Sequence, residues 1–421
     1  MSTTPILNAA YPAGVMDYTP PPEILERYAD LLVNYALGKG QGIKPGDVVR
    51  VVSDDDATPM FAEVCKTVWR GGGHVIQMLR LADSDPSRLN RAFFELASDE
   101  QLEFFPARYS RGMVDETDHQ INILSDGDPH ILEGIDPEKA LRHRRAFKPQ
   151  MQWRDAKENA GKFSWTMAQY ATPGMAAEAG MSVEQYWEQI IKACFLDRED
   201  PIARWRDVEA QIGRLRGWLD DLRIDRVHVE GEDADLWIKI GEKRRWLGGD
   251  GANIPSFEVF TSPDWRGTEG WIRFSQPLYA YGSLISGIRL EFKSGLVVDA
   301  TAEQNETLLR TLVASDGADR IGEFSLTDSR LSPIDRFMAN TLFDENAGGP
   351  CGNTHVALGQ SYQDAYDGDP ATVSAEEWVR LGFNDSAVHQ DIVSTTGRAV
   401  TAVLRDGTEH LIYAGGHFTL D

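Results

Sequence analysis

The sequence predicts an α/β N-terminal domain built on a parallel sheet, followed by an α+β, strand-rich C-terminal domain that carries a metal site. Residues 47–79 have the pattern strand, helix, strand, which is the β-α-β unit of a parallel sheet. From Val227 onward the chain changes to short apolar runs separated by turn residues, as antiparallel pairing requires. We expect one domain over residues 1–240 and a second over 241–421, which begins with a glycine-rich stretch.

The first half of the chain alternates apolar residues at helical spacing with continuous apolar runs. The predicted helices are 24–37, 60–69, 88–105, 137–159, 183–195 and 202–222. The predicted strands are 47–52, 74–79, 121–124 and 163–170. The helix predicted over 137–159 is long and basic. The glycines at 71–73 precede a strand instead of following one, so we interpret them as a turn and not as a phosphate-binding loop.

The second half has the alternation of exposed and buried positions that is typical of strands. The predicted strands are 227–229, 236–240, 257–260, 271–274, 288–292, 296–299, 388–393, 398–404 and 410–413, with one helix over 305–315. The last two strands form a hairpin, because Asp406-Gly407 is a strong turn signal. The stretch 342–359 is rich in turn residues, so we expect a loop that ends in a short helix-favouring segment, 356–358.

Charge and composition exclude several classes of partner. The chain has 421 residues with 42 basic and 66 acidic side chains, a net charge of -24 that argues against nucleic-acid and anionic-membrane partners. No apolar run is long enough to cross a bilayer, and the first residues do not resemble a signal peptide. Three widely spaced cysteines suit a reducing compartment. We therefore expect a cytoplasmic protein.

Acidic and imidazole side chains recur at strand ends and turns in the second half. The candidates for metal binding are Glu258, Glu323, Glu345, His355, His389 and Asp391. His389 and Asp391 share one face of a strand because they are two residues apart. Four carboxylates would balance two divalent cations, and mixed oxygen and nitrogen ligands suit zinc, cobalt or manganese. Cys351 and His355 have the spacing of a zinc pair, but a single cysteine in a glycine-rich turn is more typical of a turn residue.

The motifs around these residues resemble the M29 family of metallo-aminopeptidases, the aminopeptidase T and aminopeptidase S group. In chain order they are NIPSFEVFTSP at 253–263, TEG at 268–270, IGE at 321–323, NTLFDEN at 340–346, HVALG at 355–359 with Tyr362 after it, and HQD at 389–391. The resemblance implies that the six candidates hold two metal ions, with Glu323 or Glu345 as the bridging or basic carboxylate. It also implies a homodimer. The loop between Glu345 and His355 is longer than in the shortest family members.

The resemblance implies hydrolysis of the N-terminal residue from peptides by a metal-activated water. Glu323 would accept and return the proton, and Tyr362 would stabilise the oxyanion. Glu269 and Asp344 are candidates for supporting the ligands, or else form a turn cap and an ion pair. Two alternatives stay open from the sequence: a single-iron ring-cleaving dioxygenase of the same superfamily, and a non-catalytic binding protein of this fold.

Overall fold

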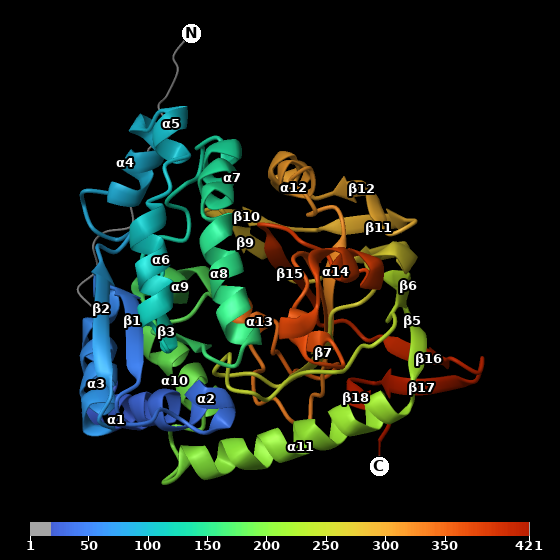
Figure 1. Ribbon diagram of the computed structural model, residues 1–421, viewed down its shortest axis with the longest axis horizontal. Helices are drawn as coiled ribbons and strands as arrows, with labels where there is room; N and C mark the ends of the chain where they lie inside the picture. Colours follow the sequence, from blue (N-terminus) through green and yellow to red (C-terminus); the bar gives the residue numbers. More distant parts are fainter. Residues whose placement is uncertain (1–17, 421) are drawn as a thin grey trace.

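The computed structural model describes residues 18–420. The stretch that we interpreted as lacking a signal peptide lies mostly outside this range. Figure 1 shows the N-terminal elements, blue to green, beside the C-terminal elements, yellow to red, with helix α11 (Pro201–Asp221) running beneath both. No helix among the described residues is long and apolar enough to cross a membrane.

The N-terminal half is built on a four-stranded parallel sheet in the order β2-β1-β3-β4. Its strands are β1 (Val48–Asp54), β2 (His74–Arg80), β3 (His119–Leu124) and β4 (Ser164–Gln169). Helices α1 (Pro22–Leu31) and α3 (Thr58–Arg70) pack together and bury their apolar faces in the core. Three other helices of this half are α2 (Leu37–Gly40), α9 (Pro173–Glu178) and α10 (Val183–Ala193). The predicted parallel sheet is confirmed.

Two long helices predicted from the sequence are broken in the structure. The segment 88–105 forms α4 (Leu89–Leu96) and α5 (Asp99–Leu102), because Ser98 begins a new helix through a capping box with Gln101. The segment 137–159 forms α7 (Pro137–Ala146) and α8 (Lys148–Asn159), because Pro149 cannot continue the hydrogen bonding of the preceding turn. Helix α6 (Ala107–Glu116) was not predicted.

The C-terminal half contains two antiparallel sheets and a short hairpin, as the alternating runs predicted. The larger sheet has eight strands in the order β12-β11-β8-β6-β5-β16-β17-β18. Its strands are β5 (Ile224–Gly231), β6 (Ala234–Lys239), β8 (Glu269–Arg273), β11 (Arg289–Lys293), β12 (Leu296–Thr301), β16 (Ala399–Leu404), β17 (Glu409–Ala414) and β18 (His417–Phe418). The hairpin consists of β9 (Leu278–Ala280) and β10 (Ser283–Ile285). The predicted hairpin around Asp406 and Gly407 is formed by β16 and β17.

The smaller sheet positions the candidate metal ligands. Its order is β15-β14-β13-β7, and its strands are β7 (Glu258–Thr261), β13 (Ile321–Thr327), β14 (Asn353–Gly359) and β15 (His389–Ser394). The helices of this half are α12 (Glu306–Val313), α13 (Thr341–Asp344) and α14 (Ala375–Leu381).

The prediction of a helix-favouring segment at 356–358 was wrong, because these residues belong to strand β14. Every residue of β14 is buried, and the strand pairs with β13 on one side and β15 on the other. A central strand that is covered on both faces has a continuous apolar run, which local sequence does not distinguish from a buried helical turn.

Candidate metal centre

Five of the six candidate ligands project from one face of the smaller sheet. Residues paired across antiparallel strands present their side chains on the same face. Thr327 of β13 lies opposite Glu258, and Ser325 of the same strand lies opposite His355. Because residues two apart in a strand share a face, Glu323 joins them there.

Strand β15 contributes its pair to the same face. Ala357 of β14 lies opposite Glu323 on one side and opposite Asp391 on the other, and Gly359 lies opposite His389. Gly359 has a φ of +107°, and a Cβ atom there would lie 2.0 Å from the Val388 carbonyl oxygen. Glycine is therefore required where β14 approaches the start of β15. The predicted chelating face of β15 is present.

His355 lies at the centre of the cluster. Its Nε2 atom is 3.3 Å from Glu258 Oε2, 3.2 Å from Glu323 Oε1 and 4.0 Å from Asp391 Oδ1. The Glu258 carboxylate also accepts a hydrogen bond from Ser325 Oγ at 2.8 Å, which holds its other contacts in place. Ser325 was not predicted as part of the site, although its position two residues after Glu323 places it on the same face.

His389 and Asp391 form the second group with Glu323. His389 Nε2 is 3.6 Å from Glu323 Oε2 and 3.4 Å from Asp391 Oδ1. Its Nδ1 atom lies 2.8 Å from the Gln360 carbonyl oxygen, which accepts the Nδ1 proton. This bond fixes the tautomer and leaves Nε2 as the nitrogen available to a metal. Glu323 therefore faces one imidazole with each of its carboxylate oxygens.

Glu345 reaches the site from the end of helix α13 instead of from the sheet. Asn340 caps this helix by accepting the Leu342 N–H, and Asp344 accepts the N–H groups of Met338 and Asn340. Asn253 Nδ2 donates to Glu345 Oε1 at 3.2 Å. The Asn253 segment is in turn attached to β4, since Met167 N donates to Ala252 O. The N-terminal sheet thus helps to orient a carboxylate of the site.

Tyr362 lies beside the imidazole of His389. The two ring centroids are 4.8 Å apart, and the Tyr362 ring also contacts Phe260 of β7. The Tyr362 N–H donates to Ser262 Oγ at 2.8 Å, which fixes the residue at the edge of the sheet. Burial, together with the charges of the nearby carboxylates Glu323 and Asp391, raises the pKa of the phenol well above its ordinary value. The Tyr362 hydroxyl can therefore donate a hydrogen bond to a group bound in the site.

The cluster has strongly perturbed pKa values because carboxylates are crowded in a buried place. Burial raises the pKa of Glu323 to about 7 and that of Glu345 well above its ordinary value. Burial opposes charge on the imidazoles, but Glu258 and Glu323 outweigh it and raise the pKa of His355 well above its usual value, while Asp391 raises that of His389 to about 9. The raised pKa values mean that the crowded carboxylates favour bound protons in the absence of metal. Metal cations would provide the same compensating positive charge.

The donor set fits divalent cations. Glu258, Glu323 and His355 offer ligand atoms that lie within 4.8 Å of one another, and Glu323, His389 and Asp391 do the same. The two groups share Glu323. Clustered carboxylate and imidazole side chains of this kind are the donor types that divalent metals bind in metalloproteases. The members of both groups were all predicted from the sequence.

Two other sequence candidates lie elsewhere. Glu269 is exposed at the start of β8, where its carboxylate accepts the Ser294 N–H at 2.7 Å, so it caps a turn and does not support the ligands. Cys351 lies in the turn before β14 and is not among the residues grouped as a possible metal site. The longer loop before His355 packs through the N–H groups of Gly348 and Gly349 against the Ile334 carbonyl oxygen.

The chain is similar to known metalloproteases over almost its whole length. Residues 22–418 match the family of thermophilic metalloproteases M29. The chain is 31% identical to aminopeptidase T of Thermus thermophilus over 94% of its length and 100% of the relative, and 29% identical to aminopeptidase 2 of Geobacillus stearothermophilus over 94% and 98%.

A solved structure agrees with these relatives. Wild-type AmpT from Thermus thermophilus superposes with a TM-score of 0.78 at 28% identity, covering 94% of this chain and 99% of that one. The predicted family and enzyme class, a metallo-aminopeptidase, are confirmed, and neither the dioxygenase nor the non-catalytic alternative is favoured. The chain belongs to the M29 family of metalloproteases.

Proposed function

We propose that this protein removes the N-terminal residue from peptides by using two divalent cations, zinc, cobalt or manganese. Glu258, Glu323 and His355 would hold one ion, and Glu323, His389 and Asp391 the other, with Glu345 as a further ligand. The observation that carries the proposal is the position of Glu323, whose two oxygens face different imidazoles at 3.2 and 3.6 Å. A carboxylate in that position can bridge two metal sites.

The ions would supply Lewis-acid polarisation of the scissile carbonyl and a water of lowered pKa. The side chains of this chain do the rest. The proton of the attacking water is accepted, and delivered to the leaving amine, by a carboxylate that is not saturated by metal, which the sequence predicted to be Glu323. Glu345 is the second candidate for this step, because it is outside both groups of possible ligands and is held by Asn253. Tyr362 donates its phenolic hydrogen to the developing oxyanion.

The free amino terminus of the substrate is recognised by the acidic cluster. An α-ammonium group has a pKa near 8 and is a cation at neutral pH. The free amino terminus would bind a metal ion or an acidic side chain of this site, whereas an internal peptide segment has no free amine for either contact. This difference restricts cleavage to the first residue.

Two isosteric variants, Glu323→Gln and Glu345→Gln, test these roles. Metal content is measured by elemental analysis, and release of the first residue from short peptides is measured with and without a chelator. If the replaced carboxylate bridges the metal ions, the variant should lose metal. If it is the general base, the variant should keep its full metal content but lose turnover. Full activity of Glu323→Gln would remove Glu323 from both roles. A metal-loaded wild-type protein that released no amino acid from any peptide would contradict the proposed function.

We also propose a homodimer located in the cytoplasm. Large apolar side chains are exposed on the N-terminal half, with Leu96 82% and Phe104 67% accessible, and such surface is typical of protein interfaces. The three cysteines are free thiols, which suits a reducing compartment. Light scattering coupled to gel filtration tests the dimer, and cell fractionation tests the location.

A further inference from the structure

The candidate metal centre is most accessible along strand β15. The side chains of His389 and Asp391 are 16% and 15% exposed, whereas those of Glu258 and His355 are 6% and 1% exposed. Strand β15 is also the edge strand of its sheet. A peptide therefore reaches the ligands over this edge, and the part of the peptide beyond the scissile bond lies near the residues that flank β15.

The basic segment α7–α8 lies against the start of this edge strand. It carries seven lysine and arginine side chains against three acidic ones, in a chain whose net charge is -24. Arg144 Nε donates to the Ala387 carbonyl oxygen at 2.6 Å, two residues before His389. Lys148 Nζ pairs with Asp385 at 2.9 Å. The sequence singled out this basic helix, and the hydrolytic chemistry does not use it.

A small cavity separates the two segments. Its volume is about 110 Å³, and it is lined by basic, acidic and apolar side chains, among them Arg144, Arg145, Lys148, Asp316, Leu141 and Val388. Because Arg145 and Lys148 are paired with acidic side chains, Arg144 is the group of this lining that can attract an anion. The apolar walls lower the effective dielectric constant and strengthen such a contact.

Arg144 is the cation of this cavity that lacks a counter-charge. Arg145 pairs with Glu138, and Lys148 pairs with Asp385. Among residues 18–420, Arg144 forms no ion pair, and its side-chain hydrogen bond to Ala387 uses only Nε. The bond holds the guanidinium in position while the two terminal nitrogens stay available. A fixed, planar donor pair of this kind matches the geometry of a carboxylate.

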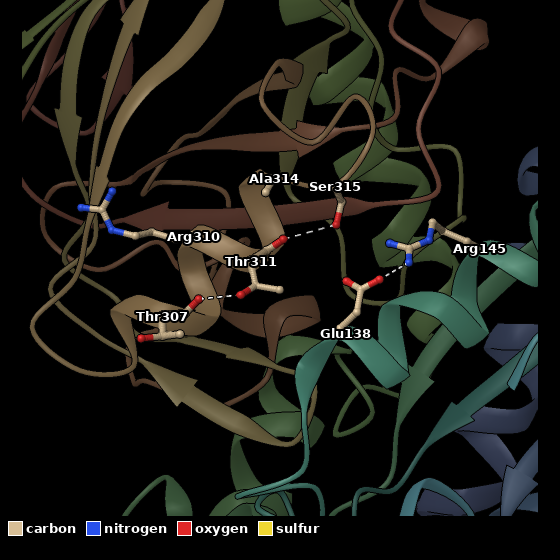
Figure 2. A pocket seen from close by; sticks show the side chains of 7 residues that line it. All are labelled: Glu138, Arg145, Thr307, Arg310, Thr311, Ala314 and Ser315. Carbon is tan, nitrogen blue, oxygen red and sulfur yellow. Dashed lines mark hydrogen bonds and ion pairs between the residues drawn. The ribbon is translucent and has the colours of Figure 1, made fainter. Parts of the chain in front are cut away.

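A larger cavity borders this one and is shown in Figure 2. This outer cavity, of about 520 Å³, shares Arg145 and Ser315 with the inner one. Figure 2 shows Arg145 and Glu138 on one wall and helix α12, with Thr307 and Thr311, on the other, while the Arg310 guanidinium points away from Glu138 and Arg145.

We propose that Arg144 binds the C-terminal carboxylate of a short peptide whose first residue lies at the metal centre, so that di- and tripeptides with a free carboxylate are preferred substrates. This inference rests on the proposed aminopeptidase function. Ala387 and His389 are two positions apart in the chain, so their Cα atoms are separated by at most about 7 Å. One or two residues beyond the scissile bond cover about the same distance. A longer or amidated peptide places no carboxylate there.

The test compares tripeptides that differ only in a free or amidated C-terminus. The wild-type enzyme is expected to cleave the free acid with a kcat/KM about fivefold higher, a factor typical of one solvent-accessible charge pair. Arg144→Gln should lose most of this preference, so that its ratio of kcat/KM for the free acid to kcat/KM for the amide falls towards one. Arg144→Lys should keep part of it, because the charge stays and the planar fork is lost.

Arg142→Gln is the matched control, since Arg142 lies on the same helix but pairs with Asp99, away from the cavity. Its preference should equal that of the wild type. A wild-type enzyme without a preference for the free acid, or an undiminished preference in Arg144→Gln, would overturn the proposal.

A second measurement separates this inference from the proposed function. Binding of N-acetylated tripeptides, as free acid and as amide, is titrated by saturation-transfer NMR on wild type and Arg144→Gln. These peptides have no free amino terminus, so binding does not depend on turnover. If no peptide is hydrolysed but the acid binds more tightly in an Arg144-dependent way, the aminopeptidase proposal fails and the carboxylate site stands. Equal binding of acid and amide would remove the site.

Discussion

Replacing Asn253 by leucine should lower the catalytic activity, although Asn253 is not itself a candidate metal ligand. Asn253 Nδ2 donates to Glu345 Oε1 at 3.2 Å, and Glu345 is only 6% exposed. Leucine has the same branched shape and the same number of side-chain heavy atoms as asparagine but no donor. The variant therefore leaves a buried carboxylate with one hydrogen bond fewer and leaves the backbone contact of this segment with Met167 intact.

The expected size of the effect follows from the charge on the acceptor. A hydrogen bond to a charged group contributes about 1.5–3 kcal/mol. Loss of a partner that orients a metal-binding carboxylate lowers metal affinity or activity by about 10- to 100-fold. The assay is kcat/KM for release of the N-terminal residue from a dipeptide at saturating metal, together with the metal dissociation constant.

A matched control is Asn34→Leu, because Asn34 Nδ2 also donates to a carboxylate, Asp30 Oδ1 at 2.6 Å, but on the exposed surface. The control should retain full activity. Asn253→Asp should be at least as damaging as Asn253→Leu, because it places a second negative charge against Glu345. Activity and metal affinity of Asn253→Leu within twofold of the wild type would refute the role of Asn253 in orienting Glu345.

Three further outcomes are expected. Metal binding at pH 7.5 should release at least one proton, because the pKa of His389 is about 9 in the absence of metal and its Nε2 must lose the proton to bind. Calorimetry in two buffers of different ionisation enthalpy measures the number of protons released. Metal binding without proton release would contradict this prediction. Arg398→Met should lower the free energy of unfolding by about 3–5 kcal/mol in denaturant titrations, because it leaves Asp233 without its fully buried partner. An unchanged denaturation midpoint would contradict this prediction. Phe257→Ala should cost about 3–5 kcal/mol by the same measurement, because Phe257 is fully buried and stacks on Trp205 at 5.1 Å; a cost below 1 kcal/mol would show that this contact contributes little.

The sequence predicted which candidate ligands would come together better than it predicted the elements that hold them. His389 and Asp391 were placed on one strand face by their spacing, and the pairing with β14 confirms that face. The sequence did not reveal how Glu345 arrives from a helix end, nor that Asn253 holds it through a contact with the N-terminal sheet. These contacts join residues 92 positions apart, and no local pattern encodes such a pairing.

Local sequence was sufficient wherever a short-range rule determined the backbone. The parallel sheet follows from the alternation of apolar runs and helical periods, and the final hairpin follows from Asp406-Gly407. Ser98 and Pro149 mark the points at which two predicted helices are broken in the structure, and both residues are visible in the local sequence. Hydrophobic periodicity alone predicted one continuous helix across each of them.

Sequence by itself determined the fold class, the acidic character and the identity of the candidate ligands, because these depend on residue type and spacing. Only the tertiary structure decided that 356–358 is a strand, because β13 and β15 supply the hydrogen bonds for its backbone on both sides. It also decided that Glu323 lies between two imidazoles and that Arg144 faces a cavity beside β15. Those positions arise from strand register and helix packing, which bring together side chains that are distant in the chain.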